Sequence, residues 1–244
     1  MSDEARNDAT GAAAEKAPEA GSAREGAKMV LAVAAFALIS AGVLGFVYAR
    51  TRPLIEQAKR EEKGRAFAYI LPEFDNKPLD TRRCAEPPGA PPGDACRKSL
   101  YTATRRGEVV GHALETFSTA CFGPRVDLLV AATPDLAVSG VYILGHQETP
   151  GLGAKIVDGN KDWKNPGQAR RKPFILQFAG KRLGGFDFRV RNDGGQVEVI
   201  TASTITSRCV AEAIEEALRI IRDRAAMLEA GAPGIFSAEQ GGAP

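Results

Sequence analysis

Five hydroxyl side chains crowd into one seven-residue stretch, TASTITS, which lies just ahead of a helix-like segment. Thr201 is suited to end a strand and Ser203 to close a turn. Thr206 or Ser207 is suited to cap the helix. Thr204 is left without a structural duty. Since the free N–H groups and the positive dipole end of a helix start favour a phosphate, the stretch predicts a phosphate close to Thr204.

A second polar motif reads HQETPGLGAKI. Pro150 and Gly151 fit the central positions of a type II turn, and Gly153 allows the backbone to approach a flat ligand closely. Glu148 and Thr149 place polar groups immediately before the turn. The motif therefore predicts either a ligand loop or an ordinary Pro-Gly turn, and taken alone it favours the ordinary turn.

Other reactive-site patterns are missing from the sequence. It contains two histidines and four cysteines without a CxxC pair, so the usual zinc spacings are absent. GLGAK lacks the third glycine of GxGxxG and the GK[ST] of a P-loop, and no GxSxG elbow is present. Cys121 is interpreted as a small buried hydrophobe rather than a nucleophile. The 32 basic and 30 acidic residues nearly cancel without forming a basic stripe, which argues against nucleic acid as a partner.

An uncharged apolar run, residues 29–49, precedes both motifs. It is long enough to cross a membrane as one helix and too long for an ordinary signal peptide, so we expect a transmembrane helix. More basic residues flank its C-terminal side, and the positive-inside rule then points the following domain into the cytoplasm. Cys84 and Cys96 favour the opposite orientation, with the domain outside the cytoplasm, because they bracket a loop that a disulfide can close in an oxidising compartment.

The remaining chain divides by composition. Residues 1–28 are expected to form a disordered N-terminal tail, and residues 229–244 a flexible C-terminal tail. Residues 50–99 combine a juxtamembrane helix, ended by Pro72, with a Pro/Gly-rich loop. Residues 100–228 are expected to form the domain that positions both motifs.

Within that domain, short alternating segments predict a sheet. YTATRRGEVVGHALETFS and DLLVAATPDLAVSGVYIL each indicate two strands, joined around Arg106-Gly107 and Pro134-Asp135. FILQFAG is a further strand candidate, and RVRNDGGQVEVIT indicates a hairpin. A helix follows, because apolar residues recur at spacings of three and four across residues 210–221. The fold class is therefore α+β: a single N-terminal transmembrane helix followed by one mixed α+β domain.

The two motifs together, downstream of one membrane span, resemble those of the G subunit of the Rnf-type ion-translocating electron-transport complex. That family has an FMN-binding domain, and its motifs read ETPGLG and [ST]-G-A-T-x-[ST]. The C subunit of the sodium-translocating NADH:quinone reductase is related and shares both motifs, although GLGAK is nearer to the GLGDK of the Rnf type. Trp163 and the stretch CFGP also lie where the Rnf-type family has similar residues, and the resemblance extends to about Met227.

The resemblance implies FMN covalently attached through its phosphate to Thr204. Thr201, Ala202 and Ser203 complete the match of TASTITS to the family's [ST]-G-A-T-x-[ST] motif, with Ala202-Ser203 in place of the family's Gly-Ala. Because alanine restricts φ, this departure affects the turn that a modifying enzyme must recognise. The other cofactor-binding residues that we expect are Glu148, Thr149, Leu152, Gly153 and Lys155.

The implied function is that of a flavoprotein that carries electrons in a complex coupling ferredoxin:NAD oxidoreduction to ion translocation, without catalytic residues or a metal of its own. Its partners would be the other membrane subunits, membrane lipid and, during maturation, a flavin transferase that uses FAD. The domain would lie outside the cytoplasm, at the inner membrane. Two alternatives remain open: a component like the C subunit of a sodium-translocating NADH:quinone reductase, and a flavin-free, single-span assembly or binding module.

Overall fold

The computed structural model describes residues 20–85, 96–164 and 173–229. It divides into two compact units, which meet between Ala58 and Lys59. The first unit consists of the N-terminal part of helix α1 (Ala20–Ile70). Large apolar side chains along this part, from Met29 to Tyr48, are exposed. The helix is long and apolar enough to cross a membrane, as residues 29–49 predicted.

The helix begins earlier than expected. The predicted tail, residues 1–28, is wrong for residues 20–28, which form the first turns of α1. Alanine, glutamate and lysine in AGSAREGAK favour helix, and the apolar segment that follows continues it without a new nucleation step. The rest of the predicted tail lies outside the described residues, as do residues 230–244.

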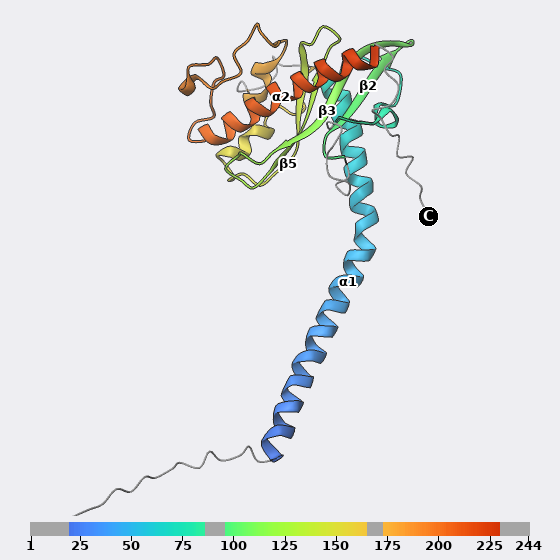
Figure 1. Ribbon diagram of the computed structural model, residues 1–244, viewed down its shortest axis with the longest axis vertical. Helices are drawn as coiled ribbons and strands as arrows, with labels where there is room; N and C mark the ends of the chain where they lie inside the picture. Colours follow the sequence, from blue (N-terminus) through green and yellow to red (C-terminus); the bar gives the residue numbers. More distant parts are fainter. Residues whose placement is uncertain (1–19, 86–95, 165–172, 230–244) are drawn as a thin grey trace, which may run out of the picture. The chain divides into compact units, whose positions relative to one another are not determined.

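The second unit is built on a five-stranded sheet in the order β1-β2-β3-β4-β5, with every neighbouring pair antiparallel (Figure 1). Both predicted strand pairs are confirmed. At the first turn, Arg106 and Gly107 have φ values of 54° and 85°, which match the two positive values of a type I′ hairpin. The strands are β1 (Arg83–Cys84), β2 (Ser99–Arg105), β3 (Glu108–Ser118), β4 (Val126–Ala132) and β5 (Val138–His146).

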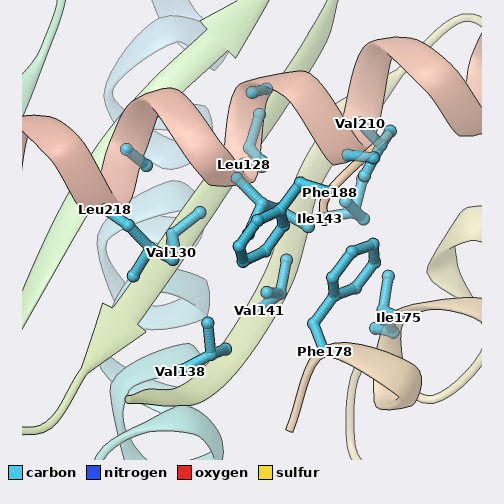
Figure 2. Close-up of a cluster of buried hydrophobic side chains, with 14 of the residues drawn as sticks. Leu128, Val130, Val138, Val141, Ile143, Ile175, Phe178, Phe188, Val210 and Leu218 are labelled. Atoms are coloured by element: carbon cyan, nitrogen blue, oxygen red, sulfur yellow. The ribbon is translucent and has the colours of Figure 1, made fainter. Parts of the chain in front are cut away.

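Strand β4, which lies between β3 and β5, is buried on both faces. Leu128 and Val130 belong to the core under helix α2 (Thr204–Glu229), as Figure 2 shows. Leu129 and Ala131 belong to the second core, which includes the end of α1. Because alternate side chains of a strand point to opposite faces, α2 and the end of α1 cover opposite faces of the sheet.

One glycine permits the close packing of α1. A Cβ atom at Gly140, on β5, would lie 2.5 Å from Cβ and 2.6 Å from Cα of Ile70. The helix backbone therefore approaches the sheet more closely than any residue with a side chain allows. Phe67, one turn earlier, is fully buried and makes an edge contact with Tyr101, with ring centroids 5.0 Å apart.

Two predicted elements are wrong. FILQFAG does not form a strand; Phe174–Phe178 is a 3-10 helix, because a short apolar run without alternation is buried on every side. The predicted hairpin after it is also absent from the described residues. Arg191–Asp193 is a single 3-10 turn, and Val190 and Val197 form one isolated parallel bridge.

Two disulfides link the four cysteines. Cys84 and Cys96 are paired, with a Cα–Cα distance of 5.5 Å, which agrees with the disulfide alternative. Cys121 pairs with Cys209 across 88 residues and is half-buried, so its interpretation as a small buried hydrophobe is wrong. Sequence spacing carried no signal for this pair, since its partners meet only when the fold brings α2 against the loop after β3.

Candidate cofactor site

The two motifs meet at a cavity of about 340 Å³. One wall comes from the turn after β5, the second from the start of α2, and the third from the loop between β3 and β4. The lining residues are Phe122, Glu148, Thr149, Leu152, Gly153, Ala202, Ser203, Thr204, Ile205 and Thr206.

The carboxylate of Glu148 joins all three walls. Its Oε1 accepts a hydrogen bond of 2.8 Å from the backbone N–H of Gly123, and its Oε2 accepts one of 2.7 Å from the Thr206 hydroxyl. Only 5% of the Glu148 residue is exposed. Hydrogen bonds to a buried carboxylate are stronger than neutral ones, so Glu148 fixes the relative positions of the walls.

The Pro-Gly turn has the predicted type II form. Gly151 has φ 77°, and the N–H of Leu152 donates to the carbonyl of Thr149 over 3.2 Å. The structure gives a further reason for glycine at position 153, besides the expected close approach of a flat ligand, which stays a prediction. A Cβ atom there would collide with the Glu148 carboxylate and would lie 2.9 Å from Oγ1 of Thr206. Glycine is therefore required by the packing of this hydrogen-bonded pair, whatever ligand the cavity takes.

Helix α2 begins at Thr204, so the predicted capping by Thr206 or Ser207 is wrong. Both lie inside the helix and have other partners. The Thr206 hydroxyl donates to Glu148. The Ser207 hydroxyl accepts from the N–H of Ile200 at 2.9 Å and donates to the carbonyl of Ser203 at 2.9 Å. The Ser207 hydroxyl thus holds the helix start to the preceding turn, and the Thr206 hydroxyl holds it to Glu148 of the HQETPGLGAKI motif.

The turn before α2 spans residues 200–203. Ser203 closes it as expected, since its N–H donates to the carbonyl of Ile200 at 2.9 Å. Thr201 is exposed within the turn and does not end a strand. Ala202 follows it with φ 61°, in the left-handed region. This is the position where the related families have glycine, which adopts such a φ without steric cost.

Replacing Ala202 by glycine is expected to raise the free energy of unfolding by about 0.5–1 kcal/mol. The left-handed conformation costs alanine roughly 1–2 kcal/mol, and the greater freedom of glycine in the unfolded chain offsets part of the gain. Thermal unfolding of the two proteins tests this. Ala226→Gly, at an exposed site within α2, is the control and should lower stability by about 1 kcal/mol. A decrease in both variants would contradict the argument.

The rim of the cavity is apolar. Phe122, Ile205 and Leu152 are 69%, 49% and 41% exposed. Among the described residues after α1, Val109 is the other large apolar side chain with comparable exposure. Exposed apolar groups gathered around a cavity are typical of a site that binds a flat ring. Leu152 was predicted for this site, whereas Phe122 and Ile205 were not; CFGP, around Phe122, was the available signal.

The remaining predicted site residues divide into two groups. Ala202, Ser203 and Thr204 line the cavity, as do Glu148, Thr149, Leu152 and Gly153. Thr201 and Lys155 are exposed and lie outside the lining. The roles of all these residues toward a cofactor stay predictions.

The first turn of α2 contains no acidic residue of its own. Arg208, the nearest basic side chain along the helix, already donates to both carboxylate oxygens of Asp193 at 2.6 and 2.8 Å. These hydrogen bonds, together with the positive charge, lower the pKa of Asp193. The dipole at the start of α2 favours an anion near Thr204. The buried Glu148 carboxylate, which accepts from the Thr206 hydroxyl, is the acidic side chain in the same cavity lining.

Comparison with known proteins agrees with this geometry. Residues 122–219 match the family described as FMN-binding domain, and this range contains all the cavity-lining residues. The cavity suits such a ligand: its volume lies within the roughly 300–1,000 Å³ of small-molecule sites, its rim is apolar, and a helix start faces it. The chain thus contains an FMN-binding domain.

The chain is also similar to known proteins over most of its length. The chain is 31% identical over 206 residues to the G subunit of the ion-translocating oxidoreductase complex of Pseudomonas aeruginosa, with 82% of this chain and 91% of that protein covered. The G subunit of Vibrio cholerae is 30% identical over 195 residues, covering 78% and 88%. The G subunit of Cereibacter sphaeroides is 33% identical over 200 residues, covering 79% and 83%. The chain belongs to the family of G subunits of the ion-translocating oxidoreductase complex.

Proposed function

We propose that this chain is the flavoprotein that carries electrons in a membrane-bound ion-translocating oxidoreductase complex of the Rnf type, with FMN attached to Thr204. The observation that carries the proposal is the cavity at which the ETPGLG turn meets the start of α2. Bound FMN supplies the redox chemistry, and the chain binds, orients and shields it. The other membrane subunits of the complex, which couple ferredoxin:NAD oxidoreduction to ion movement, are its partners.

Thr204 is the acceptor that the geometry favours. Among the described residues, the hydroxyls of Thr206 and Ser207 are engaged in hydrogen bonds. Thr201 lies outside the cavity lining, and Ser203 is only 7% exposed. The half-buried Thr204 combines access to the cavity with a position at the helix start, where backbone N–H groups stabilise a phosphate.

Attachment forms a phosphoester between Oγ1 of Thr204 and the phosphorus of FMN. With FAD as the donor, the pyrophosphate bond of FAD breaks, AMP leaves, and the hydroxyl proton is lost. No histidine or lysine neighbours Thr204 in the sequence to remove that proton, so a separate flavin transferase performs the reaction.

The test is to express the full-length protein with a competent flavin transferase and purify it. The expected protein is yellow, its denatured band fluoresces in a gel, and its intact mass exceeds the sequence mass by that of FMN less one water. A colourless protein without the mass increment would overturn the proposal and favour the flavin-free assembly module.

The domain is proposed to lie outside the cytoplasm, at the inner membrane. Two disulfides support this, because such bonds persist in oxidising compartments, and a whole domain can be translocated regardless of the charges that flank a span. Covalent attachment also suits that location, where lost FMN is not readily replaced.

A thiol reagent that cannot cross membranes is expected to label Lys161→Cys in intact cells. Lys161 is exposed on the domain, and all four native cysteines are in disulfides, so the introduced thiol is the reactive one. Glu25→Cys, on the other side of residues 29–49, is the matched control and should react only after lysis. The reverse pattern would place the domain in the cytoplasm.

A further inference from the structure

Phe122 lies in the loop between β3 and β4, and both of its neighbours in the chain are anchored to other parts of the domain. The preceding residue, Cys121, is bonded to Cys209 on α2. The following residue, Gly123, donates its N–H to Glu148. A phenylalanine that is 69% exposed is thus fixed at the cavity by a covalent bond on one side and a hydrogen bond to a buried carboxylate on the other.

The hairpin does not need this disulfide to form. β3 and β4 pair in an unbroken register up to Ser118 and Val126, immediately before and after the loop, so the strands close it by themselves. What the disulfide fixes is the position of the loop over α2. Cys209 is 1% exposed within the core and lies on the same helix that begins at Thr204. The loop is thereby anchored to the helix that carries the attachment site.

We propose that the Cys121–Cys209 disulfide is a positioning crosslink, which sets Phe122 as a wall of the cofactor cavity beside the ETPGLG turn. The proposal rests on FMN occupying that cavity. Without the crosslink, the Gly123 hydrogen bond is the remaining polar contact from the loop to Glu148, and Phe122 moves away from the cavity for part of the time. The attached flavin then becomes more accessible to solvent, and its redox potential changes with its surroundings.

The test compares Cys121→Ala/Cys209→Ala with Cys84→Ala/Cys96→Ala in the full-length flavinylated protein. The second pair removes the disulfide outside the cavity lining and serves as the matched control for loss of a crosslink. We expect the first variant to retain the FMN mass increment while iodide quenching of flavin fluorescence rises roughly twofold or more, because the loop has lost its covalent bond to α2. The midpoint potential should shift in the first variant and remain unchanged in the control. Equal quenching in the wild type and both variants would overturn the proposal.

A second measurement reports on the loop without the flavin. Phe122→Trp, combined with replacement of the single native tryptophan by Trp163→Phe, places the sole indole on the loop. Loss of the Cys121–Cys209 bond should lower the anisotropy of its emission, and loss of Cys84–Cys96 should not. Unchanged anisotropy would contradict the positioning role. Absence of the FMN mass increment from the wild type would instead contradict the proposed function, so the two failures are distinguishable.

Discussion

Replacing Thr204 by valine is expected to yield a protein without attached FMN. Valine keeps the shape and β-branching of threonine, so α2 should still begin at the same residue, but it lacks the oxygen that forms the phosphoester. Intact mass should then equal the sequence mass, and in-gel fluorescence should be lost. The expected effect is complete, because the phosphoester requires that one oxygen atom.

Thr201→Val is the matched control for this substitution. Thr201 belongs to the same hydroxyl-rich stretch but is exposed and lies outside the cavity lining, so its variant should retain the full mass increment. An increment that persists in Thr204→Val, or that peptide sequencing assigns to Thr201 or Thr206, would show that another hydroxyl is the acceptor. Equal thermal unfolding of the two apoproteins would confirm that valine left the fold intact.

Truncating Glu148 to alanine is expected to lower the free energy of unfolding by about 3 kcal/mol. Two donors, the Gly123 N–H and the Thr206 hydroxyl, would lose their acceptor in a buried setting, at roughly 1–3 kcal/mol each. Glu148→Gln should cost only about 1 kcal/mol, because its oxygen can accept from Gly123 while its NH₂ group donates to the Thr206 oxygen. Chemical denaturation measures both values.

Glu198→Ala is the control for loss of a carboxylate. Glu198 pairs with Arg191 at the surface, where both side chains are 65% exposed, so its removal should cost less than about 1 kcal/mol. If glutamine at position 148 proved as costly as alanine, the negative charge itself, rather than the pair of hydrogen bonds, would be what holds the walls together.

Local signals made much of the fold predictable. The hairpins followed from turn residues such as Arg106-Gly107, and α2 followed from its apolar spacing, because both are properties of neighbouring residues. The errors arose where burial on all sides erases periodicity, as in Phe174–Phe178, and where a parallel bridge replaced the expected hairpin at Val190. The start of α1 was misplaced because the long apolar helix extends into a segment that would not order alone.

The cofactor site was predictable only in part, because local sequence patterns reveal motifs but not long-range contacts. The two motifs were recognisable from their Pro-Gly turn and their hydroxyl content. The residues that join them were not, since Phe122 lies next to the Cys121–Cys209 bond, whose partners are 88 residues apart, and beside Gly123, which donates to Glu148. Nor did the sequence indicate that the Glu148 carboxylate binds the first turn of α2, because that contact depends on how the helix packs on the sheet.

Helix α2 follows all five strands in the chain, yet it covers β3 and β4 on one face of the sheet. The residues of the opposite core all precede α2 in the chain, so that core can form first. The face under α2 stays open until the ribosome has released nearly the entire domain. A domain exported as proposed therefore crosses the membrane before its last helix can dock, and the bond from Cys209 to Cys121 can form only after that docking.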